Sequence, residues 1–596
     1  PPPPPIFFFK LKTAYELLRS LVVSEMCIRD RYAPLNYQLL PERVQTKLDS
    51  ENTNVPTIYP HNVLQKIKDM NIPDSVVPGD FPPRIWKLFD VELAEPVSVI
   101  ANYILRNGEW PESWKREFVT VIEKEKDPQS KDDLRNISLT LFISKLVENL
   151  IYDLLIENFG DKLDTGQHGG RKKHSVLIYL VKMVEFVMAN LDKKKAVIMA
   201  MIDFLKAYNR QCHNRLITCF NDLGTPNYLL KILYSYLKNR KMVVRHRGSI
   251  SEECQMPGGG PQGTNLGILL YLVNINSCGV PLESLANCIN NSLSEKEALH
   301  PILPLPPPNI TETSARFKYI DDMSMCVSVN PSSLKPIDWY MERPLKYRDW
   351  TLHHLPANKN LLQQQIDNVH KFCEIQKFVI NEKKTHTVVF NTAILKDFNP
   401  HISNPDGNIY NNVENFKLLG VEFETDKKKG INLDKYVNNC IKKGFINLWI
   451  LRRLAELGVS QEHLLLVYNS RIRICVEQNV PLWMFSITNE MNNKIERLQK
   501  ISFYIILGKN ATYSYSRNLA ALSSISLEER RQKLALKFAK NVLRHPEHRK
   551  MFTFNTKVNM RSGKKVVIPT AKTARYKKTT IPSLGMIINQ KLSHKI

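Results

Sequence analysis

The feature that most constrains the fold is a pair of adjacent acids inside an alternating apolar stretch. Residues 317–324 read Phe-Lys-Tyr-Ile-Asp-Asp-Met-Ser, and a strand-like run continues to Val329. Neighbouring side chains on a strand point to opposite faces, so Asp321 and Asp322 can serve one site only at the turn of a β-hairpin. Two carboxylates this close repel each other unless a cation lies between them. The stretch predicts a hairpin that presents both acids to Mg²⁺, although Asp-Asp is also an ordinary turn dipeptide.

A third acid lies upstream, at the end of another predicted strand. The continuous apolar run Ala196–Met201 predicts a buried strand, and Asp203 follows it. Nucleotidyl transfer uses two divalent cations about 4 Å apart, which carboxylates from two different elements ordinarily hold. Adjacent strands of one sheet would bring Asp203, Asp321 and Asp322 together. The sequence therefore predicts a site for two Mg²⁺ ions, with Mn²⁺ as the alternative metal.

The charge of the chain indicates what it binds. Its 596 residues carry a net charge of +25, which predicts a polyanionic partner, with nucleic acid as the first candidate and a membrane surface as the alternative. The longest apolar runs, such as Leu266–Ile275, are too short to span a bilayer, so no membrane segment is predicted. The ten cysteines are scattered, without zinc-ligand spacing, which is typical of reduced thiols in an intracellular protein, in the nucleus or the cytoplasm.

Apolar patterns divide the rest of the chain into predicted elements. Residues 1–31 resemble a foreign leader and are set aside. Further strands are predicted at Phe118–Ile122, Met242–Arg247, Thr387–Phe390 and Phe416–Phe423. Helices are predicted at Phe142–Phe159, from about Val176 to Leu191, at Leu266–Asn276, Tyr436–Leu457, Gln461–Glu477, Asn493–Leu507 and Leu527–Leu543.

Five ordered motifs carry a family resemblance. From about Asn54 onward the chain resembles the reverse transcriptases of non-LTR retrotransposons, on the motifs MIDFLKAYNR, PGGGPQG, FKYIDDM, INEKKT and FKLLGVEF. The resemblance implies an RNA-directed DNA polymerase that uses an RNA template, a DNA primer and deoxynucleoside triphosphates. It also implies an α+β right-hand fold whose fingers and palm combine an antiparallel sheet with helices, followed by a helical thumb.

On this resemblance the chain divides into named parts. They are an N-terminal helical extension at 32–112, fingers at 113–195, a palm at 196–425 with a surface insertion at 280–315, a thumb at 426–545 and a basic tail at 546–596. An endonuclease domain would need more residues ahead of Phe118 than are present, and no ribonuclease H cluster follows. We therefore expect a polymerase module from a larger open reading frame.

The same resemblance implies roles for individual residues. Asp203, Asp321 and Asp322 would hold the catalytic metals. Tyr208, five residues after the first acid, would lie beneath the incoming sugar and collide with a 2′-hydroxyl; as an isolated residue it is equally typical of a core aromatic. The other nucleotide-binding residues implied are Lys124, Arg135, Gln262, Gly263 and Lys384. The residues implied to contact template or primer are Pro261, Tyr319, Leu418, Leu419 and Gly420.

Departures from the family pattern leave alternatives open. Asn209 and Cys212 stand where the family usually has Asp, Leu205 where it has Ser, and Glu123 and Asn136 where it has Pro. None of these is a metal ligand, but together they indicate a decaying copy, so a catalytically dead nucleic-acid-binding remnant is one alternative. An RNA-directed RNA polymerase or intron-type maturase is the second, and a structural protein without a polyanionic partner is a third.

Overall fold

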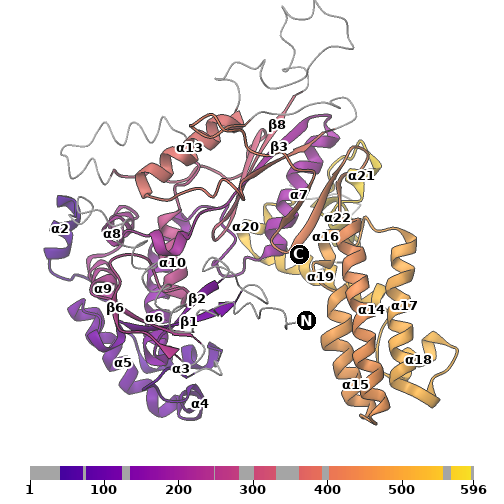
Figure 1. Cartoon of the computed structure of the whole chain (residues 1–596), viewed down its shortest axis with the longest axis horizontal. Helices are drawn as coiled ribbons and strands as arrows, with labels where there is room; N and C mark the ends of the chain where they lie inside the picture. Colours follow the sequence, from indigo (N-terminus) through magenta and orange to yellow (C-terminus); the bar gives the residue numbers. More distant parts are fainter. Residues whose placement is uncertain are drawn as a thin grey trace, which may run out of the picture. The chain divides into compact units, whose positions relative to one another are not determined.

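The structure, a computed structural model, describes residues 40–71, 76–123, 134–246, 249–280, 301–330, 361–391, 402–554 and 566–591. The chain forms two compact units that are interleaved in sequence (Figure 1). The first unit comprises residues 1–170, 203–309 and 364–381, and the second comprises 171–202, 310–363 and 382–596. Each unit combines helices with sheets, and the mixed helix-and-sheet class predicted from the sequence is confirmed.

The first unit is built mainly of helices that pack around a shared apolar core. Helix α6 spans Phe142–Phe159, as predicted, and the ring of Phe159 packs on Phe220 of α8 with centroids 5.6 Å apart. The other helices of this unit are α2 Glu42–Asp49, α3 Pro60–Asp69, α4 Pro83–Leu88, α5 Asp90–Asn107, α8 His213–Asp222, α9 Asn227–Leu237 and α10 Asn265–Asn274. Helix α13, Leu361–Gln376, belongs to this unit from residue 364 onward. Three short 3₁₀ turns are η2 Glu112–Trp114, η4 Gly160–Lys162 and η5 Ala207–Arg210.

A small sheet completes the first unit. Its strand order is β2-β1-β4-β5, with β6 pairing β4, and the β1–β4 pair is parallel whereas the others are antiparallel. The strands are β1 Arg116–Glu123, β2 Leu134–Leu139, β4 Lys241–His246, β5 Ser249–Ile250 and β6 Cys254–Gln255. A buried cluster that includes Val119 and Val244 covers the sheet.

The second unit centres on a four-stranded antiparallel sheet in the order β7-β8-β3-β9. The strands are β3 Ala196–Ile202, β7 Ser314–Tyr319, β8 Asp322–Val329 and β9 His386–Phe390. Helix α7, Val176–Asp192, packs on this sheet, and its Tyr179 ring lies 5.6 Å from that of Phe317 (Figure 1). Strand β3 lies inside the sheet and is almost entirely buried, as its continuous apolar run predicts.

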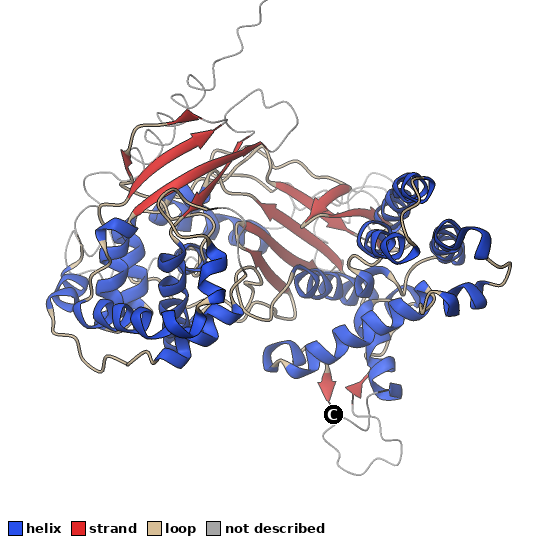
Figure 2. Ribbon diagram, turned by 90° about the horizontal axis from the view of Figure 1, so that it is seen from below, coloured by secondary structure: helices blue, strands red, loops and turns tan. Residues whose placement is uncertain are grey.

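Smaller strands and a helical region make up the rest of the second unit (Figure 2). The strands are β10 Asn415–Leu418, β11 Val421–Asp426, β12 Gly430–Asn432, β13 Thr553–Phe554 and β14 Val566–Val567. The helices are α14 Asp434–Glu456, α15 Gln461–Val467, α16 Val480–Trp483, α17 Asn489–Leu507, α18 Tyr515–Ala521, α19 Leu527–Arg544, α20 Pro546–Arg549, α21 Ala574–Lys577 and α22 Thr580–Lys591. A 3₁₀ turn, η14, covers Gly508–Asn510.

Two predicted elements are interrupted in the structure. Residues Phe416–Phe423 form two strands instead of one, because Leu419 and Gly420 both have positive φ and make a two-residue hairpin turn. Residues Gln461–Glu477 do not form one regular helix: α15 gives way to a π turn, η12, at Tyr468–Ile472 and a 3₁₀ turn, η13, at Arg473–Val476. The π turn carries the fully buried side chains of Tyr468 and Ile472.

Some of the residues described after 545, where the sequence predicts a basic tail, pack in the core of the second unit. Ile581, Leu584 and Ile588 of α22 are buried. The backbone N–H groups of Lys572 and Thr573 donate to the carboxylate of Asp192, at the end of α7. The apolar side chains of α22 recur at helical spacing, but the lysines around them hide that pattern in the sequence.

None of the helices among the described residues combines the length and the apolar character needed to cross a bilayer.

Candidate functional site

The acidic pair lies at the tip of a tight hairpin in the second unit. Tyr319 pairs with Asp322 as the last rung of β7 and β8, so Ile320 and Asp321 form the turn. The predicted hairpin therefore forms at the predicted residues. Ile320 has φ +58°, a left-handed backbone that a β-branched residue adopts only at a cost of about 1–2 kcal/mol. Both carboxylates are partly exposed.

The strand that leads to Asp203 pairs with the strand that begins at Asp322. Ile202, the last residue of β3, is paired with Met323 in the antiparallel register of β3 and β8. Asp203 is bonded directly to Ile202, and Asp322 directly to Met323. The register thus pairs the residue that precedes Asp203 with the residue that follows Asp322.

Within the first unit, Asn381 holds the side chain of Asp203. Asn381 Nδ2 donates to Asp203 Oδ2 at 2.9 Å, and the Asn381 backbone N–H donates to the Asp203 carbonyl at 2.7 Å. The pairing continues, since the Leu205 N–H donates to the Val379 carbonyl at 2.9 Å. Because the amide holds one carboxylate oxygen, the Asp203 side chain is orientated before any ligand binds.

The glycine-rich loop at 257–260 packs against the turn that carries Tyr208. The Gly259 N–H donates to the Gln211 carbonyl at 2.8 Å, and the Gly260 N–H donates to the Tyr208 carbonyl at 3.2 Å. Gly259 has φ +82°, and a Cβ there would lie 3.1 Å from the Tyr208 carbonyl oxygen. Glycine is required because two backbones approach this closely, a role more specific than the flexible turn that three glycines suggest in isolation.

The Tyr208 side chain is supported by a second tyrosine. Its ring is partly exposed and stacks on that of Tyr271 in α10, with centroids 4.9 Å apart and an interplanar angle of 21°. Tyr271 is fully buried. One face of the Tyr208 ring is therefore backed by the core of the first unit, which limits where the ring can move.

Two hydrogen bonds join the Pro261–Gly263 segment to strand β2. The Ser138 N–H donates to the Gln262 carbonyl at 2.8 Å, and the Gln262 N–H donates to Ser138 Oγ at 3.1 Å. Ser138 Oγ in turn donates to Glu117 Oε1 at 3.3 Å. Gly263 has φ +128°, a backbone conformation that favours glycine.

A buried ion pair anchors this arrangement. Arg240 Nη2 lies 3.3 Å from Glu117 Oε2, and both side chains are fully buried. Removing either partner would leave an uncompensated buried charge, at a cost of roughly 3–5 kcal/mol. The ion pair therefore fixes the side chain of Glu117. Glu117 in turn accepts a hydrogen bond from Ser138, and Ser138 accepts one from the backbone of Gln262.

Apart from Pro261, the residues expected to contact template or primer lie in two hairpins of the second unit. Tyr319 ends β7 and is partly buried. Leu418 is buried at the end of β10, while Leu419 and Gly420 form the following turn with φ of +48° and +82°. Lys384 is exposed in the turn before β9, so its ammonium group can reach a ligand.

Of the residues expected to bind the nucleotide, the structure describes one only by its backbone and another not at all. Lys124 lies outside the described residues. Arg135 belongs to β2, where its backbone pairs with Ile122, and its side chain is outside the description.

Three residues of the site were missed by sequence reasoning. Asn381 lies inside the motif INEKKT, in which attention fell on Lys384. Ser138 supports Gln262 from a strand 124 residues earlier, with no local signal. Gly267 is the third, since a Cβ there would lie 1.9 Å from the Pro261 carbonyl oxygen. The only available signal was a glycine inside an otherwise apolar helix.

Sequence comparison identifies the class of protein to which this chain is related. Curated RNA-directed DNA polymerases of Drosophila mobile elements match it at 24–31% identity, which confirms the resemblance to the reverse transcriptases of non-LTR retrotransposons. No protein-family model matches the chain.

Particular relatives define the extent of the match. The chain is 24% identical over 455 residues to the probable RNA-directed DNA polymerase from transposon BS of Drosophila melanogaster, a match that covers 75% of this chain and 44% of the relative. It is 27% identical over 256 residues to the RNA-directed DNA polymerase from mobile element jockey of the same species, covering 41% of this chain and 28% of the relative. The probable polymerase from transposon X-element is 31% identical over 179 residues, covering 29% and 20%.

The chain thus spans less than half the length of these curated relatives. Among solved structures, a structure of apo telomerase from Candida tropicalis, truncated from the C-terminal domain, overlaps with a TM-score of 0.31 and 12% identity, over 59% of this chain and 61% of that one. An overlap this weak defines neither fold nor function.

Proposed function

We propose that this chain is the polymerase part of a non-LTR retrotransposon reverse transcriptase. It extends the 3′-hydroxyl of a DNA primer with deoxynucleoside triphosphates on an RNA template. The observation that carries the proposal is the register of β3 and β8, which pairs Ile202 with Met323. Asp203 follows the first of these paired residues in sequence and Asp322 precedes the second. Its direct support in sequence is the similarity to polymerases of Drosophila mobile elements.

Asp203, Asp321 and Asp322 are the proposed ligands of two Mg²⁺ ions, with Mn²⁺ as the alternative. Carboxylate oxygens are the ligands that these hard cations prefer, and Asp321 and Asp322 are partly exposed at the hairpin tip. When bound, the metals would lower the pKa of the primer 3′-hydroxyl and neutralise charge on the triphosphate. Asn381 orientates the first of the three acids through its hydrogen bond to Asp203 Oδ2.

The residues around these acids have proposed binding roles. Tyr208, backed by Tyr271, lies beneath the sugar and excludes a 2′-hydroxyl. Gln262 and Gly263 contact the nucleotide, and Pro261 the template. Lys124, Arg135 and Lys384 bind the triphosphate, where a cation stabilises the charge that grows on the phosphates. Tyr319, Leu418, Leu419 and Gly420 hold the primer end.

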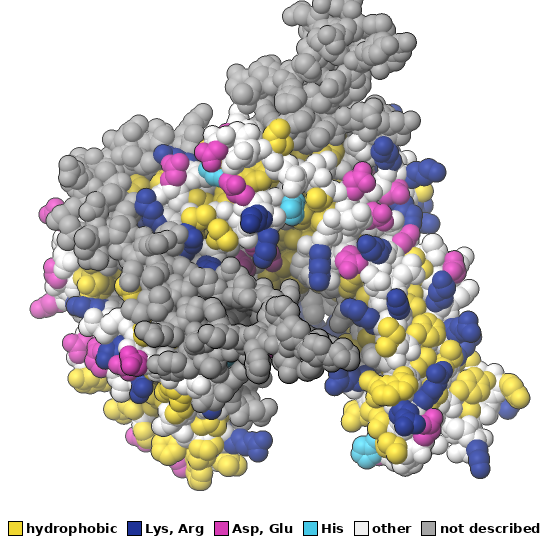
Figure 3. Space-filling view, in the orientation of Figure 1, with side chains coloured by type: hydrophobic (Ala, Val, Ile, Leu, Met, Phe, Trp, Pro, Cys, Tyr) yellow, Lys and Arg dark blue, Asp and Glu magenta, His cyan; other side chains and the backbone are white. Residues whose placement is uncertain are grey.

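In this proposal residues 113–195 form the fingers, 196–425 the palm and 426–545 the thumb of a right hand. Support for the thumb comes from one face of α14. Lys442, Ile446, Trp449 and Arg453 recur at helical spacing and are all exposed, with Trp449 at 66%. Figure 3 shows basic and apolar side chains intermingled in this region. Cationic side chains that bind phosphates, lying beside apolar side chains that pack on sugars, suit an RNA–DNA duplex.

Primer extension tests the proposed activity. The full chain should incorporate dTMP on poly(rA)/oligo(dT) in the presence of Mg²⁺, and Asp321→Asn should reduce incorporation to background while leaving template binding nearly intact. Asp406→Asn changes an exposed turn residue of the same unit and is the matched control. Extension by Asp321→Asn at the wild-type rate would overturn the assignment of the site.

A decayed, nucleic-acid-binding remnant is the second candidate function. Cys212, where the family usually has Asp, is buried, and its backbone forms an isolated bridge with Gly258. A chain that binds poly(rA)/oligo(dT) tightly but extends it with neither Mg²⁺ nor Mn²⁺ would establish this candidate. A polymerase that prefers ribonucleotides is tested by Tyr208→Ala, which should raise ribonucleotide incorporation if Tyr208 excludes the 2′-hydroxyl.

A further inference from the structure

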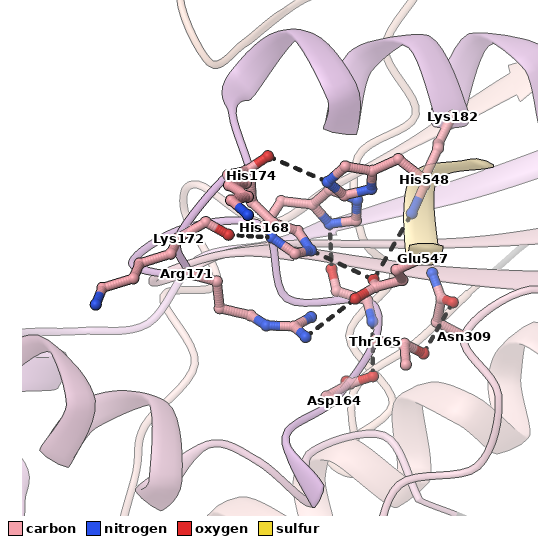
Figure 4. Close-up of polar contacts among 12 residues, drawn as sticks. Asp164, Thr165, His168, Arg171, Lys172, His174, Lys182, Asn309, Glu547 and His548 are labelled. Atoms are coloured by element: carbon pink, nitrogen blue, oxygen red, sulfur yellow. Dashed lines mark hydrogen bonds and ion pairs between the residues drawn. The ribbon is translucent and has the colours of Figure 1, made fainter. Parts of the chain in front are cut away.

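Three histidines from distant parts of the sequence meet in the second unit. His174 lies just before α7, whereas His545 and His548 lie at the junction of α19 and α20. One ring nitrogen of each lies within 4.8 Å of the other two, an arrangement found once among the described residues. The ring centroids of His174 and His548 are 4.4 Å apart (Figure 4). Those of His545 and His548 are 4.3 Å apart.

Backbone carbonyls fix which nitrogens of two rings carry protons. His548 Nε2 lies 3.2 Å from the Lys173 carbonyl, and His174 Nδ1 lies 3.1 Å from the Lys172 carbonyl. A carbonyl only accepts, so both of these nitrogens must donate. In the neutral rings, His548 Nδ1 and His174 Nε2 then carry lone pairs. Metal-ligating histidines ordinarily donate their other N–H to a carbonyl or carboxylate in this way.

Two ring nitrogens of the cluster are buried without a hydrogen-bond partner. They are Nδ1 of His545 and Nδ1 of His548. A buried polar atom left unpaired costs roughly 1–3 kcal/mol, so two in one cluster of histidines require an explanation. A bound cation that accepts both lone pairs would remove the cost.

Glu547, between the two later histidines in sequence, places a carboxylate oxygen beside His174. Its Oε1 lies 3.3 Å from His174 Nε2, so in the neutral ring two acceptors face each other. A proton or a metal ion must separate them. Arg171 Nη2 lies 3.1 Å from Oε2, and Lys182 Nζ lies 4.0 Å from Oε1 (Figure 4). A charged His174 paired with Glu547 would satisfy that contact, but it would leave the nitrogens of His545 and His548 unpaired.

We propose that His174, His545, Glu547 and His548 form a Zn²⁺ site that fastens the segment before α7 to the α19–α20 junction. Imidazole nitrogen with one carboxylate oxygen is a donor set suited to Zn²⁺, and four protein ligands are typical of a structural site. His174 and Glu547 are 373 residues apart in sequence. That separation explains why a search for closely spaced ligands predicts no zinc site.

Zinc titration of the full chain tests the proposal. After treatment with EDTA, the protein should bind one equivalent of Zn²⁺ with submicromolar affinity in competition with a chromophoric chelator. The His174→Asn/His548→Asn double variant should lose about 100-fold in affinity. His463→Asn, a histidine of α15 outside the cluster, is the matched control and should bind as the wild type does. Zinc binding unchanged in the double variant, or absent from the folded wild type, would overturn the site.

If the double variant does not fold, a second measurement still tests the proposed zinc site. Co²⁺ added to the wild-type chain should give the intense visible bands of a tetrahedral nitrogen and oxygen site, and His545→Asn, at a partly exposed position, should abolish them. Weak bands of octahedral Co²⁺, or bands that survive His545→Asn, would contradict the proposal. Neither readout uses polymerase activity, so the zinc site and the proposed function can fail separately.

Discussion

At the scale of single residues, the contact that most directly prepares the proposed chemistry is the one between Asn381 and Asp203. The amide holds one carboxylate oxygen and the backbone N–H holds the carbonyl of the same residue. Asn381 is thus a positioning residue, acting through Asp203.

Asn381→Ala should slow primer extension by about 10- to 100-fold, because it removes one hydrogen bond to a charged group. It should also raise the Mg²⁺ concentration needed for half-maximal rate, because the freed carboxylate must be ordered by the metal. Steady-state extension at varied Mg²⁺ measures both effects. Asn447→Ala, which removes an amide bonded to the Arg471 carbonyl, is the control. An unchanged Mg²⁺ dependence in Asn381→Ala would show that the contact does not position Asp203.

A second prediction at the scale of single residues concerns Gly267 and the stability of the chain. A Cβ there would lie 1.9 Å from the Pro261 carbonyl oxygen, so Gly267→Ala must displace the Pro261–Gly263 segment. We expect a loss of about 1–3 kcal/mol in the free energy of unfolding, measured with urea, and weaker nucleotide binding. Gly585→Ala is the matched helical control, because its nearest neighbour lies at 3.4 Å and alanine favours a helix by up to about 1 kcal/mol. Equal effects of the two substitutions would contradict the packing argument.

The residues proposed to bear chemistry carry clearer sequence signals than the residues that hold them in place. Asp321 and Asp322 stand out because two adjacent carboxylates need a turn and a cation. Ser138 and Asn381 carry no comparable signal, since a hydrogen bond across 124 or 178 residues depends on the folded chain alone.

At the scale of helices and strands, regular apolar periodicity predicted the elements well. Helix α6 and strand β3 form close to their expected bounds. Prediction failed where the backbone departs from regular geometry without a strong sequence signal. Leu419 adopts φ +48° before Gly420, and the π turn at Tyr468–Ile472 lies inside an unbroken helical pattern.

Helix α7 makes the stability of the second unit depend on pH. Burial raises the pKa of Glu185 to about 7, although the hydroxyl of Tyr576, on α21, donates a hydrogen bond to it. The pKa of Glu185 in the folded chain lies above its value of about 4.3 in the unfolded chain. The contribution of Glu185 to the free energy of unfolding is therefore complete below a pH of about 4.3, and it is lost as the pH rises through about 7.

Glu185→Gln should therefore gain stability over the wild type as pH rises. Between pH 5 and pH 8 the difference in free energy of unfolding should shift in favour of the variant by an amount on the order of 3 kcal/mol or less. Urea unfolding at the two pH values measures it, with the exposed Glu462→Gln as control. A difference independent of pH would mean that Glu185 is not protonated in the folded chain at pH 5.

At the scale of the whole molecule, a net charge of +25 should make nucleic-acid binding strongly dependent on salt. If the proposed function holds, affinity for poly(rA)/oligo(dT) should fall by about 10³-fold or more between 50 and 200 mM salt, as for about six or more phosphate contacts. Fluorescence anisotropy at several salt concentrations gives the slope. Binding that is insensitive to salt would argue against phosphate contacts, and no binding would favour a structural protein.

The interleaving of the two units could not be predicted from a linear division of the sequence. The boundary between them falls after Ile202, within a stretch that the sequence presents as continuous, and residues 364–381 return to the first unit. The same is true of the C-terminal segment, in which Thr573 bonds to Asp192 across 381 residues. Such contacts follow from tertiary packing and leave no local periodicity.

The central claim is that Asp203, Asp321 and Asp322 share one pair of metal ions. Mn²⁺ binding, followed by electron paramagnetic resonance with template, primer and a non-reactive nucleotide present, tests it most directly. We expect two tightly bound ions in the wild type and the loss of at least one in both Asp203→Asn and Asp321→Asn, with Asp406→Asn unchanged. If Asp203→Asn keeps both ions at wild-type affinity, the three acids do not form a common site and the account is wrong.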